Sequence, residues 1–206
     1  ILNHISLQEE QKIQLPKLRK ISLEPDNRKK ILLLSDDALL GSGIATMSRE
    51  LMFGTAHHYK WRQLGAALHH PEHGKVRNIS DLVNNQMGIS NADVVQYLHN
   101  GYGTKEVLYE LIGIEKPDAI MAFTDPRFFG WLFVLEHELR TKFGIPIIYN
   151  AIWDNLIWPT WNASGYASVD LLLGISKQSH NIHREVLKIH GDTFIDLYKP
   201  TEVNAQ

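Results

Sequence analysis

Short apolar runs alternate with amphipathic stretches along most of the chain. Apolar residues on consecutive positions, as at residues 31–34 and 119–123, are typical of parallel strands that helices cover on both sides. The pattern predicts strands at residues 30–34, 58–64, 93–99, 119–123, 145–149 and 169–175, with a last extended piece at 194–198. It predicts helices after residue 43 and at residues 104–114, 127–143 and 177–190. This alternation predicts a Rossmann-like, doubly wound α/β domain, with a mostly parallel sheet and helices on both faces.

Residue spacing and cap residues give the expected orientation and limits of these helices. The first helix should place Ile44, Met47 and Leu51 on its inward face. Thr104 is expected to cap the start of the second helix, and Gly144 to end the third. Each cap residue predicts only one end of its helix, and the other end is predicted from the spacing of apolar residues.

Polar residues recur where the predicted strands end. They are Asp36 and Asp37, Asn100, Thr124 and Asp125, Asn150 and Asp154, and Ser176 and Lys177. Ligands of open α/β sheets bind outside the carboxyl ends of the strands. We therefore expect the functional site along that edge of the sheet.

A loop of small residues, Gly41, Ser42 and Gly43, follows the first strand and opens the first helix. Small residues let the backbone approach a ligand, and the start of a helix offers free N–H groups and positive potential to an anion. The loop is thus a candidate phosphate-handling loop. An equally good interpretation is that the two glycines only form the turn.

Composition indicates an ordinary globular domain and excludes some chemistries, but it does not indicate a particular function. The 206 residues carry 44% hydrophobic and 21% charged positions, as in an ordinary globular domain. A net charge of −2 predicts no nucleic-acid partner. The absence of cysteine excludes disulfides and thiolate chemistry. No apolar run approaches the roughly 20 residues of a membrane helix, so no transmembrane segment and a cytoplasmic location are expected.

Several familiar chemistries fit the sequence poorly. His69, Glu72 and His73 match the H-x-x-E-H zinc pattern, but Pro71 interrupts the helix that this pattern needs, so no metal site is expected. A dinucleotide fingerprint would need a third small residue at Thr46 and an acidic residue after the second strand, which ends without one. A receiver-like domain would need a phospho-acceptor aspartate on a middle strand, and a serine hydrolase would need a G-x-S-x-G elbow.

Several segments, in their order and spacing, resemble one family. They are the glycine loop, TDPRF at residues 124–128, PIIYNAIWDN at 146–155, GISK at 174–177 and IDLYKP at 195–200. Together they resemble the N-terminal domain of retaining GT-B glycosyltransferases of the glycogen-synthase-like group. The last segment resembles the stretch that joins the two domains of that fold.

The resemblance implies one half of a GT-B fold. Residues 1–29 would be an N-terminal extension, residues 30–200 the acceptor-side domain, and residues 201–206 the start of the interdomain linker. The parent enzyme would transfer a sugar from a nucleotide-sugar donor to the hydroxyl of an acceptor glycan or other compound, with retention and without a metal or other cofactor. Because the family's donor-binding domain would follow the linker, these residues alone are expected to be nearly inactive.

The resemblance also assigns residues to the site. Gly41, Ser42 and Gly43 would bind the donor diphosphate through their backbone. The acceptor would be bound by Asp125, Arg127, Asn150, Trp153, Asp154, Asn155 and Lys177. Asp125 and Asp154 are the candidates for a catalytic role. Tryptophan and carboxylate side chains suit sugars, because a ring face stacks on indole while carboxylates accept hydroxyl protons, although the tryptophans could equally pack the loop.

One departure and two alternatives qualify this hypothesis. Family members commonly carry a histidine where this chain has Asn150 and Ala151, so the contact of that histidine with the donor sugar is in doubt. The same edge could belong to a non-catalytic α/β module that binds a glycan or a nucleotide. It could also belong to the acceptor half of a split transferase.

Overall fold

A seven-stranded sheet forms the centre of the protein. The computed structural model describes residues 27–153, 155 and 157–190. Its strands are β1 (Lys29–Asp36), β2 (Tyr59–Ala67), β3 (Val76–Asn78), β4 (Val94–Asn100), β5 (Ala119–Phe123), β6 (Ile147–Ala151) and β7 (Leu171–Gly174). Their order is β3-β4-β2-β1-β5-β6-β7, and β3 pairs with β4 in the antiparallel direction while the other pairs are parallel.

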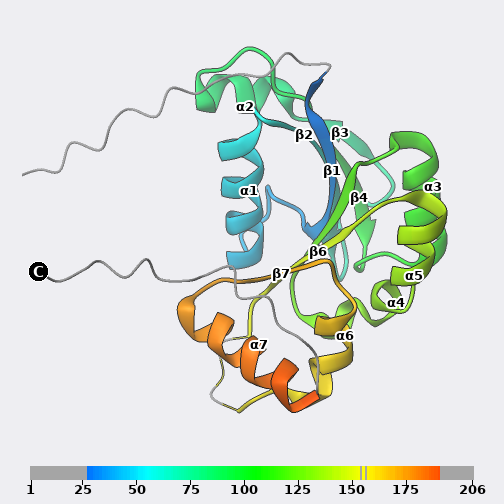
Figure 1. Cartoon of the computed structure of the whole chain (residues 1–206). Helices are drawn as coiled ribbons and strands as arrows, with labels where there is room; N and C mark the ends of the chain where they lie inside the picture. The colour runs from blue at the N-terminus through cyan, green and yellow to red at the C-terminus, as the bar shows by residue number, and fades with distance from the viewer. Residues whose placement is uncertain (1–26, 154, 156, 191–206) are drawn as a thin grey trace, which may run out of the picture.

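Helices cover the sheet on both sides. They are α1 (Gly43–Thr55), α2 (Ser80–Met87), α3 (Lys105–Glu115), α4 (Gly130–Phe133), α5 (Glu136–Glu138), α6 (Ala163–Ala167) and α7 (Lys177–His190), with short turns η2 (Pro126–Phe128), η3 (Leu139–Phe143) and η4 (Thr160–Asn162). Figure 1 shows α1 and α2 on one side of the sheet and α3, α4 and α5 on the other. The predicted doubly wound α/β fold is confirmed.

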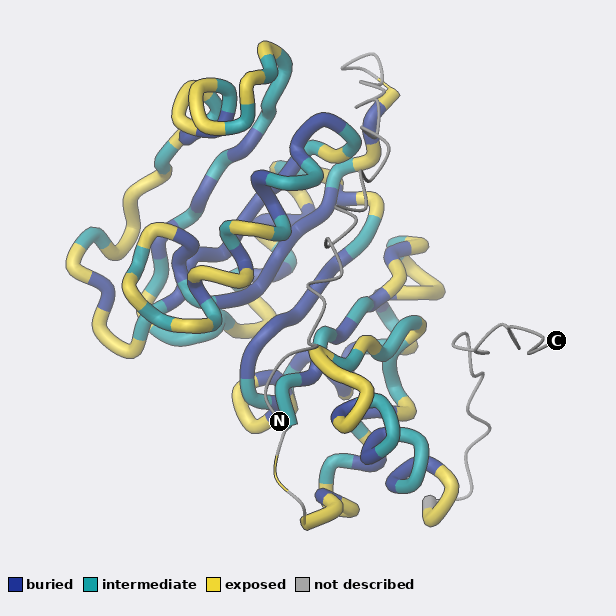
Figure 2. Tube along the Cα trace, turned by 90° about the vertical axis from the view of Figure 1, so that its left-hand side faces the viewer, coloured by how far each residue is buried: buried dark blue, intermediate teal, exposed yellow. Residues whose placement is uncertain are grey.

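Strand β1 shows how this layering follows from the sequence. Its side chains alternate between faces, so Leu32 and Leu34 join the core cluster beneath α3, α4, α6 and α7, while Ile31 and Leu33 join the cluster beneath α1 and α2. All four are buried, and Figure 2 shows the strands as the buried centre of the molecule. The continuous apolar run at residues 31–34 therefore correctly indicated a strand with helices on both faces.

The strand order defines one topological switch point. From β1 the chain moves to one side, through β2 to β4, and then crosses over to β5 on the other side of β1. The connections that leave β1 and β5 therefore diverge at the carboxyl edge, between α1 and η2. Open α/β sheets bind ligands at this position.

The predicted inward face of helix α1 was right in two of its three residues. Ile44 and Leu51 are half-buried and pack against the core cluster, whereas Met47 is 44% exposed. The fully buried positions are Ala45, Ser48, Met52 and Phe53. Ala45 and Ser48 were missed because small side chains carry little hydrophobic signal. Thr104 caps α3 as predicted, since its side chain accepts a hydrogen bond from the backbone of Val107.

The long helix predicted at residues 127–143 is instead a series of short pieces: η2, α4, α5 and the wide turn η3. Gly130 and four aromatic residues lie in its first half, and both residue types lower helix propensity. Its apolar residues still reach the core, where Phe129, Leu132 and Leu139 are fully buried. Gly144 ends the series in the left-handed conformation, as predicted.

Three strands or helices had no counterpart in the sequence prediction, namely β3, α2 and the short helix α6. Gly88, which ends α2 with a φ of 63°, was an available signal. Residues 1–26 of the predicted extension at 1–29, the extended piece at 194–198 and the linker at 201–206 lie outside the described residues, while Lys29 already belongs to β1. Within the part of the chain that the structure describes, no helix combines the length and the apolar character needed to cross a bilayer.

Candidate functional site

The carboxyl ends of the parallel strands lie side by side, as the sequence predicted. Ser35 in β1 is in register with Phe123 in β5, and Phe123 is in register with Asn150 in β6. Asp36 and Thr124 therefore emerge next to each other at the switch point. The edge continues through β7, whose last residue leads into α7.

A hydrogen-bonded chain ties the glycine loop to the strands. The hydroxyl of Ser42 donates to Oδ2 of Asp36 at 2.5 Å, and the hydroxyl of Tyr102 donates to Oδ1 of Asp36 at 2.7 Å. Ser42 also caps α1, because its side-chain oxygen accepts from the backbone of Ala45 at 2.9 Å. Both carboxylate oxygens of Asp36 are thus engaged, and the start of α1 is held against β1.

Tyr102 is itself held firmly by its neighbours. Its ring stacks on Phe128, with the ring centroids 4.4 Å apart. The next residue, Gly103, has a φ of 88°, and a Cβ there would lie 2.8 Å from the side chain of Leu64, so only glycine fits. Burial raises the pKa of Tyr102 above its usual range, and the hydrogen bond to Asp36 raises it further. Tyr102 therefore stays a hydrogen-bond donor at neutral pH.

The two glycines of the loop are not required by the fold. Neither Gly41 nor Gly43 has a positive φ. A Cβ built at either position would meet no atom within 4 Å. The small size of these residues is therefore not explained by backbone strain or by packing within the described residues. The loop presents its backbone to open space at the switch point.

Beneath the loop lies a buried polar network that sequence reasoning missed. Asp37, which is 1% exposed, accepts hydrogen bonds from Gln96 at 2.7 Å and from the backbone of Leu39 at 3.0 Å. His70 lies 3.1 Å from the same carboxylate, and its other ring nitrogen accepts from the backbone of Glu72, so the nitrogen that faces Asp37 carries the proton. A glutamine at matching positions of two neighbouring strands was the available signal, since Gln63 and Gln96 are in register and bonded.

The H-x-x-E-H segment forms a turn rather than a helix. The residue it buries is His70, while His69 and His73 are exposed. Glu72 is paired with Arg77 and Lys75. Among the described residues, no group of three or more histidine, aspartate or glutamate side chains is arranged to hold a metal ion.

Asp125 and Arg127, predicted to bind the acceptor, bind each other. Two guanidinium nitrogens of Arg127 lie 2.7 and 2.9 Å from the carboxylate oxygens of Asp125. Hydrogen bonds from Arg127 lower the pKa of Asp125, so this carboxylate is ionised at neutral pH and is a weak base. As a catalytic candidate Asp125 is therefore disfavoured, although it lies at the predicted edge.

The other predicted acceptor residues are spread over β6, the loop after it and α7. Asn150 lies in β6, in register with Phe123 of β5, and so stays at the predicted edge. The indole N–H of Trp153 donates to the carbonyl of Ile157 at 3.0 Å, and its ring meets Trp161 edge to face with the centroids 5.7 Å apart. Asn155 is exposed, whereas Asp154 lies outside the described residues. Lys177 begins α7 and lines a pocket there together with Trp158.

Comparison of the chain with protein-family models and with curated proteins gives no match. The site is therefore interpreted from its own geometry. A glycine loop, the start of a 13-residue helix and an exposed aromatic ring at Phe128 meet beside the two strands of the switch point. This arrangement suits a ligand with an anionic group and a ring.

Proposed function

We propose that the chain is the acceptor-side domain of a glycosyltransferase, in which the loop Gly41–Gly43 receives the diphosphate of a nucleotide-sugar. One observation carries the proposal: the two glycines on either side of Ser42, which the fold does not require, face open space at the switch point. The family resemblance of the segments at the same edge supports it. The proposed setting is the cytoplasm, with no nucleic-acid partner, in keeping with the net charge of −2.

The backbone of the loop supplies the donors for this role. The first hydrogen bond within α1 runs from the backbone of Thr46 to the carbonyl of Ser42, and the N–H of Ala45 is taken by the Ser42 side chain. The N–H groups of Gly43 and Ile44 therefore have no partner within the helix. They add to the positive end of the helix dipole, so an oxyanion bound there is stabilised.

The carboxylate of Asp36 lies close to this loop, and its negative charge would repel a bound diphosphate unless that charge is compensated. Its two oxygens accept from Ser42 and Tyr102, which spreads its charge over two hydroxyl donors. We assign Asp36 the role of fixing the loop rather than of contacting the donor. The bound diphosphate would lie on the side of the loop where Gly41 and Gly43 are open.

In the proposed reaction, the acceptor-side domain has one main role, which is to stabilise the charge of the leaving diphosphate. The acceptor oxygen bonds to the anomeric carbon of the donor sugar as the bond from that carbon to the diphosphate oxygen breaks. The electron pair leaves with the diphosphate, which takes up the hydroxyl proton. Backbone N–H groups of the loop stabilise this developing charge without a metal. A second domain, as in the family, would bind the nucleotide.

A non-catalytic binding module is the second candidate. It is favoured by the hydrogen bonds of the carboxylates at the switch point, because Asp36, the buried Asp37 and Asp125 are all engaged by neighbouring side chains. None of the three is placed to exchange a proton with a ligand. The same edge would then hold a glycan or a nucleotide without transforming it.

Nucleotide-sugar hydrolysis separates the two candidates. The full-length protein is incubated with UDP-, GDP-, ADP- and dTDP-sugars, and the release of nucleoside diphosphate is measured. The transferase hypothesis predicts slow, enzyme-dependent hydrolysis of one nucleotide class. Saturable binding of a nucleotide-sugar or glycan without any release would establish the binding module instead.

A further inference from the structure

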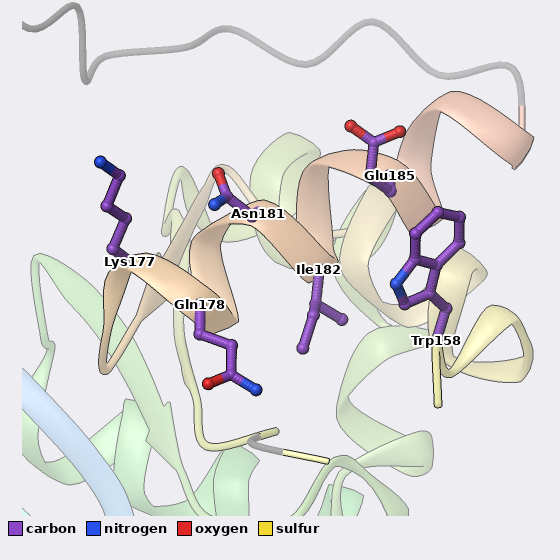
Figure 3. A pocket seen from close by; sticks show the side chains of 6 residues that line it. All are labelled: Trp158, Lys177, Gln178, Asn181, Ile182 and Glu185. Atoms are coloured by element: carbon purple, nitrogen blue, oxygen red, sulfur yellow. The ribbon is translucent and has the colours of Figure 1, made fainter. Parts of the chain in front are cut away.

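A groove runs along the outer surface of α7. Its volume is about 380 Å³, which falls within the usual range of ligand pockets. It is lined by Trp158, Lys177, Gln178, Asn181, Ile182 and Glu185. Figure 3 shows Lys177, Asn181 and Glu185 along one side of the helix, Gln178 and Ile182 along another, and Trp158 at the end near Glu185.

The loop that carries Trp158 exposes three large apolar side chains to solvent. Trp158 is 47% exposed, and its loop neighbours Ile157 and Trp161 are 64% and 62% exposed. Single exposed apolar residues are common, but a gathering of this kind marks an interaction surface. Trp158 is the member of this group that lines the groove.

We propose that the groove binds a short, neutral oligosaccharide. The indole of Trp158 would stack on the apolar face of one sugar ring. The amides of Gln178 and Asn181 and the carboxylate of Glu185 would exchange hydrogen bonds with ring hydroxyl groups. From Lys177 to Glu185 the helix rises about 12 Å, which is longer than a single sugar ring. The ligand is therefore expected to be longer than a monosaccharide.

The lining carries one charged residue of each sign, at opposite ends of the groove. Lys177 lies at one end, and Glu185 lies at the end with Trp158. The carboxylate of Glu185 is itself paired, because its Oε1 lies 3.1 Å from Nζ of Lys188 and 3.4 Å from Nε of Arg184. The Trp158 end therefore has no excess of negative charge, and a neutral ligand meets no opposing charge there. Because indole also stacks on a nucleobase, a nucleotide is included as a competing probe in the test.

The groove is separate from the proposed diphosphate loop. Helix α7 starts at the carboxyl end of β7, and β7 is three strands away from β1. Strands are spaced about 4.8 Å apart, so the two places are on the order of 15 Å apart along the edge. The inference goes beyond the proposed transfer reaction, because the groove can bind sugar whether or not the switch point binds a donor.

The test is sugar binding by the full-length protein in the absence of nucleotide. Calorimetry with maltotriose, cellotriose and chitotriose as probes should detect binding of at least one of them. Trp158→Ala should weaken that binding about tenfold and Asn181→Ala about fivefold. Trp158→Phe should retain most of it. Trp161→Ala is the matched control, because Trp161 is exposed on the same loop but does not line the groove.

Three outcomes would overturn the inference. One is that none of the three trisaccharides binds although the thermal unfolding of the protein is normal. Another is that Trp161→Ala weakens binding as much as Trp158→Ala. The third is that uridine monophosphate binds more tightly than the sugars and depends on Trp158. Because no nucleotide-sugar is present, these results are independent of the hydrolysis test of the proposed transferase.

Discussion

Substitution of Gly43 by valine should reduce turnover of the nucleotide-sugar by about 100-fold or more, the size of effect seen when an oxyanion donor is lost. The valine side chain would occupy the open space in front of the loop and shield the N–H groups at the start of α1. Gly43→Ala should have a smaller effect of the same kind. Steady-state rates of nucleoside diphosphate release from the full-length protein measure both.

Gly54→Val is the matched control, since Gly54 lies in the same helix and its Cβ would also meet nothing within 4 Å. Valine has a higher helix propensity than glycine, so both variants should be at least as stable as the wild type. Equal turnover in Gly43→Val and wild type would contradict the loop assignment. So would an equal loss in Gly54→Val, because that glycine is remote from the edge.

Substitution of Glu115 by glutamine should lower the free energy of unfolding by about 3 kcal/mol at neutral pH, the cost of breaking a buried ion pair. Glu115 ends α3, and its carboxylate accepts from Lys30 at 2.9 Å, from Arg62 at 2.7 Å and from the hydroxyl of Tyr97. Arg62 is also paired with Asp93. The cluster joins α3 to β1, β2 and β4, and the Glu115 side chain is only 11% exposed. Urea denaturation measures the loss.

The effect should depend on pH in a defined direction. Burial by itself would raise the pKa of Glu115, but hydrogen bonds from Tyr97, Lys30 and Arg62 outweigh it and lower the pKa to about 2, from an ordinary value of 4.5. The folded state thus prefers the ionised carboxylate, and its contribution is present above pH 4.5 and lost as the pH falls towards 2. The stability difference between wild type and Glu115→Gln should fall to roughly half by pH 3.

Glu110→Gln is the control for this substitution, because Glu110 is exposed on the same helix. Its stability should stay within about 0.5 kcal/mol of the wild type at any pH. A constant difference between wild type and Glu115→Gln from pH 7 to pH 3 would contradict the lowered pKa. A loss no larger than that of Glu110→Gln would show that the cluster does not stabilise the fold.

The apolar pattern of the sequence was sufficient to predict the fold class, because buried parallel strands carry an unbroken signal. Residues 119–123 form a strand with the predicted limits. Helix faces were harder to predict where small side chains do the packing, as Ala45 and Ser48 do in α1. The helix at residues 127–143 was over-predicted because its apolar residues keep a helical face while its backbone is interrupted.

That the polar strand ends meet at one edge of the sheet was predictable, but the hydrogen bonds among them were not. Strand ends placed Asp36 and Asp125 at one edge because all the parallel strands end there. That Tyr102 would reach Asp36 depends on the turn after β4, and one partner of Asp37, His70, comes from a loop 33 residues away. Contacts of this range follow from the packed structure rather than from local pattern. The assignment to a glycosyltransferase stays a prediction.

The most direct test of the diphosphate loop is a titration of the isotopically labelled full-length protein with uridine diphosphate and with inorganic pyrophosphate, followed by NMR. The amide signals of Gly41, Ser42 and Gly43 should shift in a saturable way, while that of Gly54 at the far end of α1 should not. Saturable binding that leaves the three loop amides unmoved, or the absence of binding at millimolar concentration, would contradict the account.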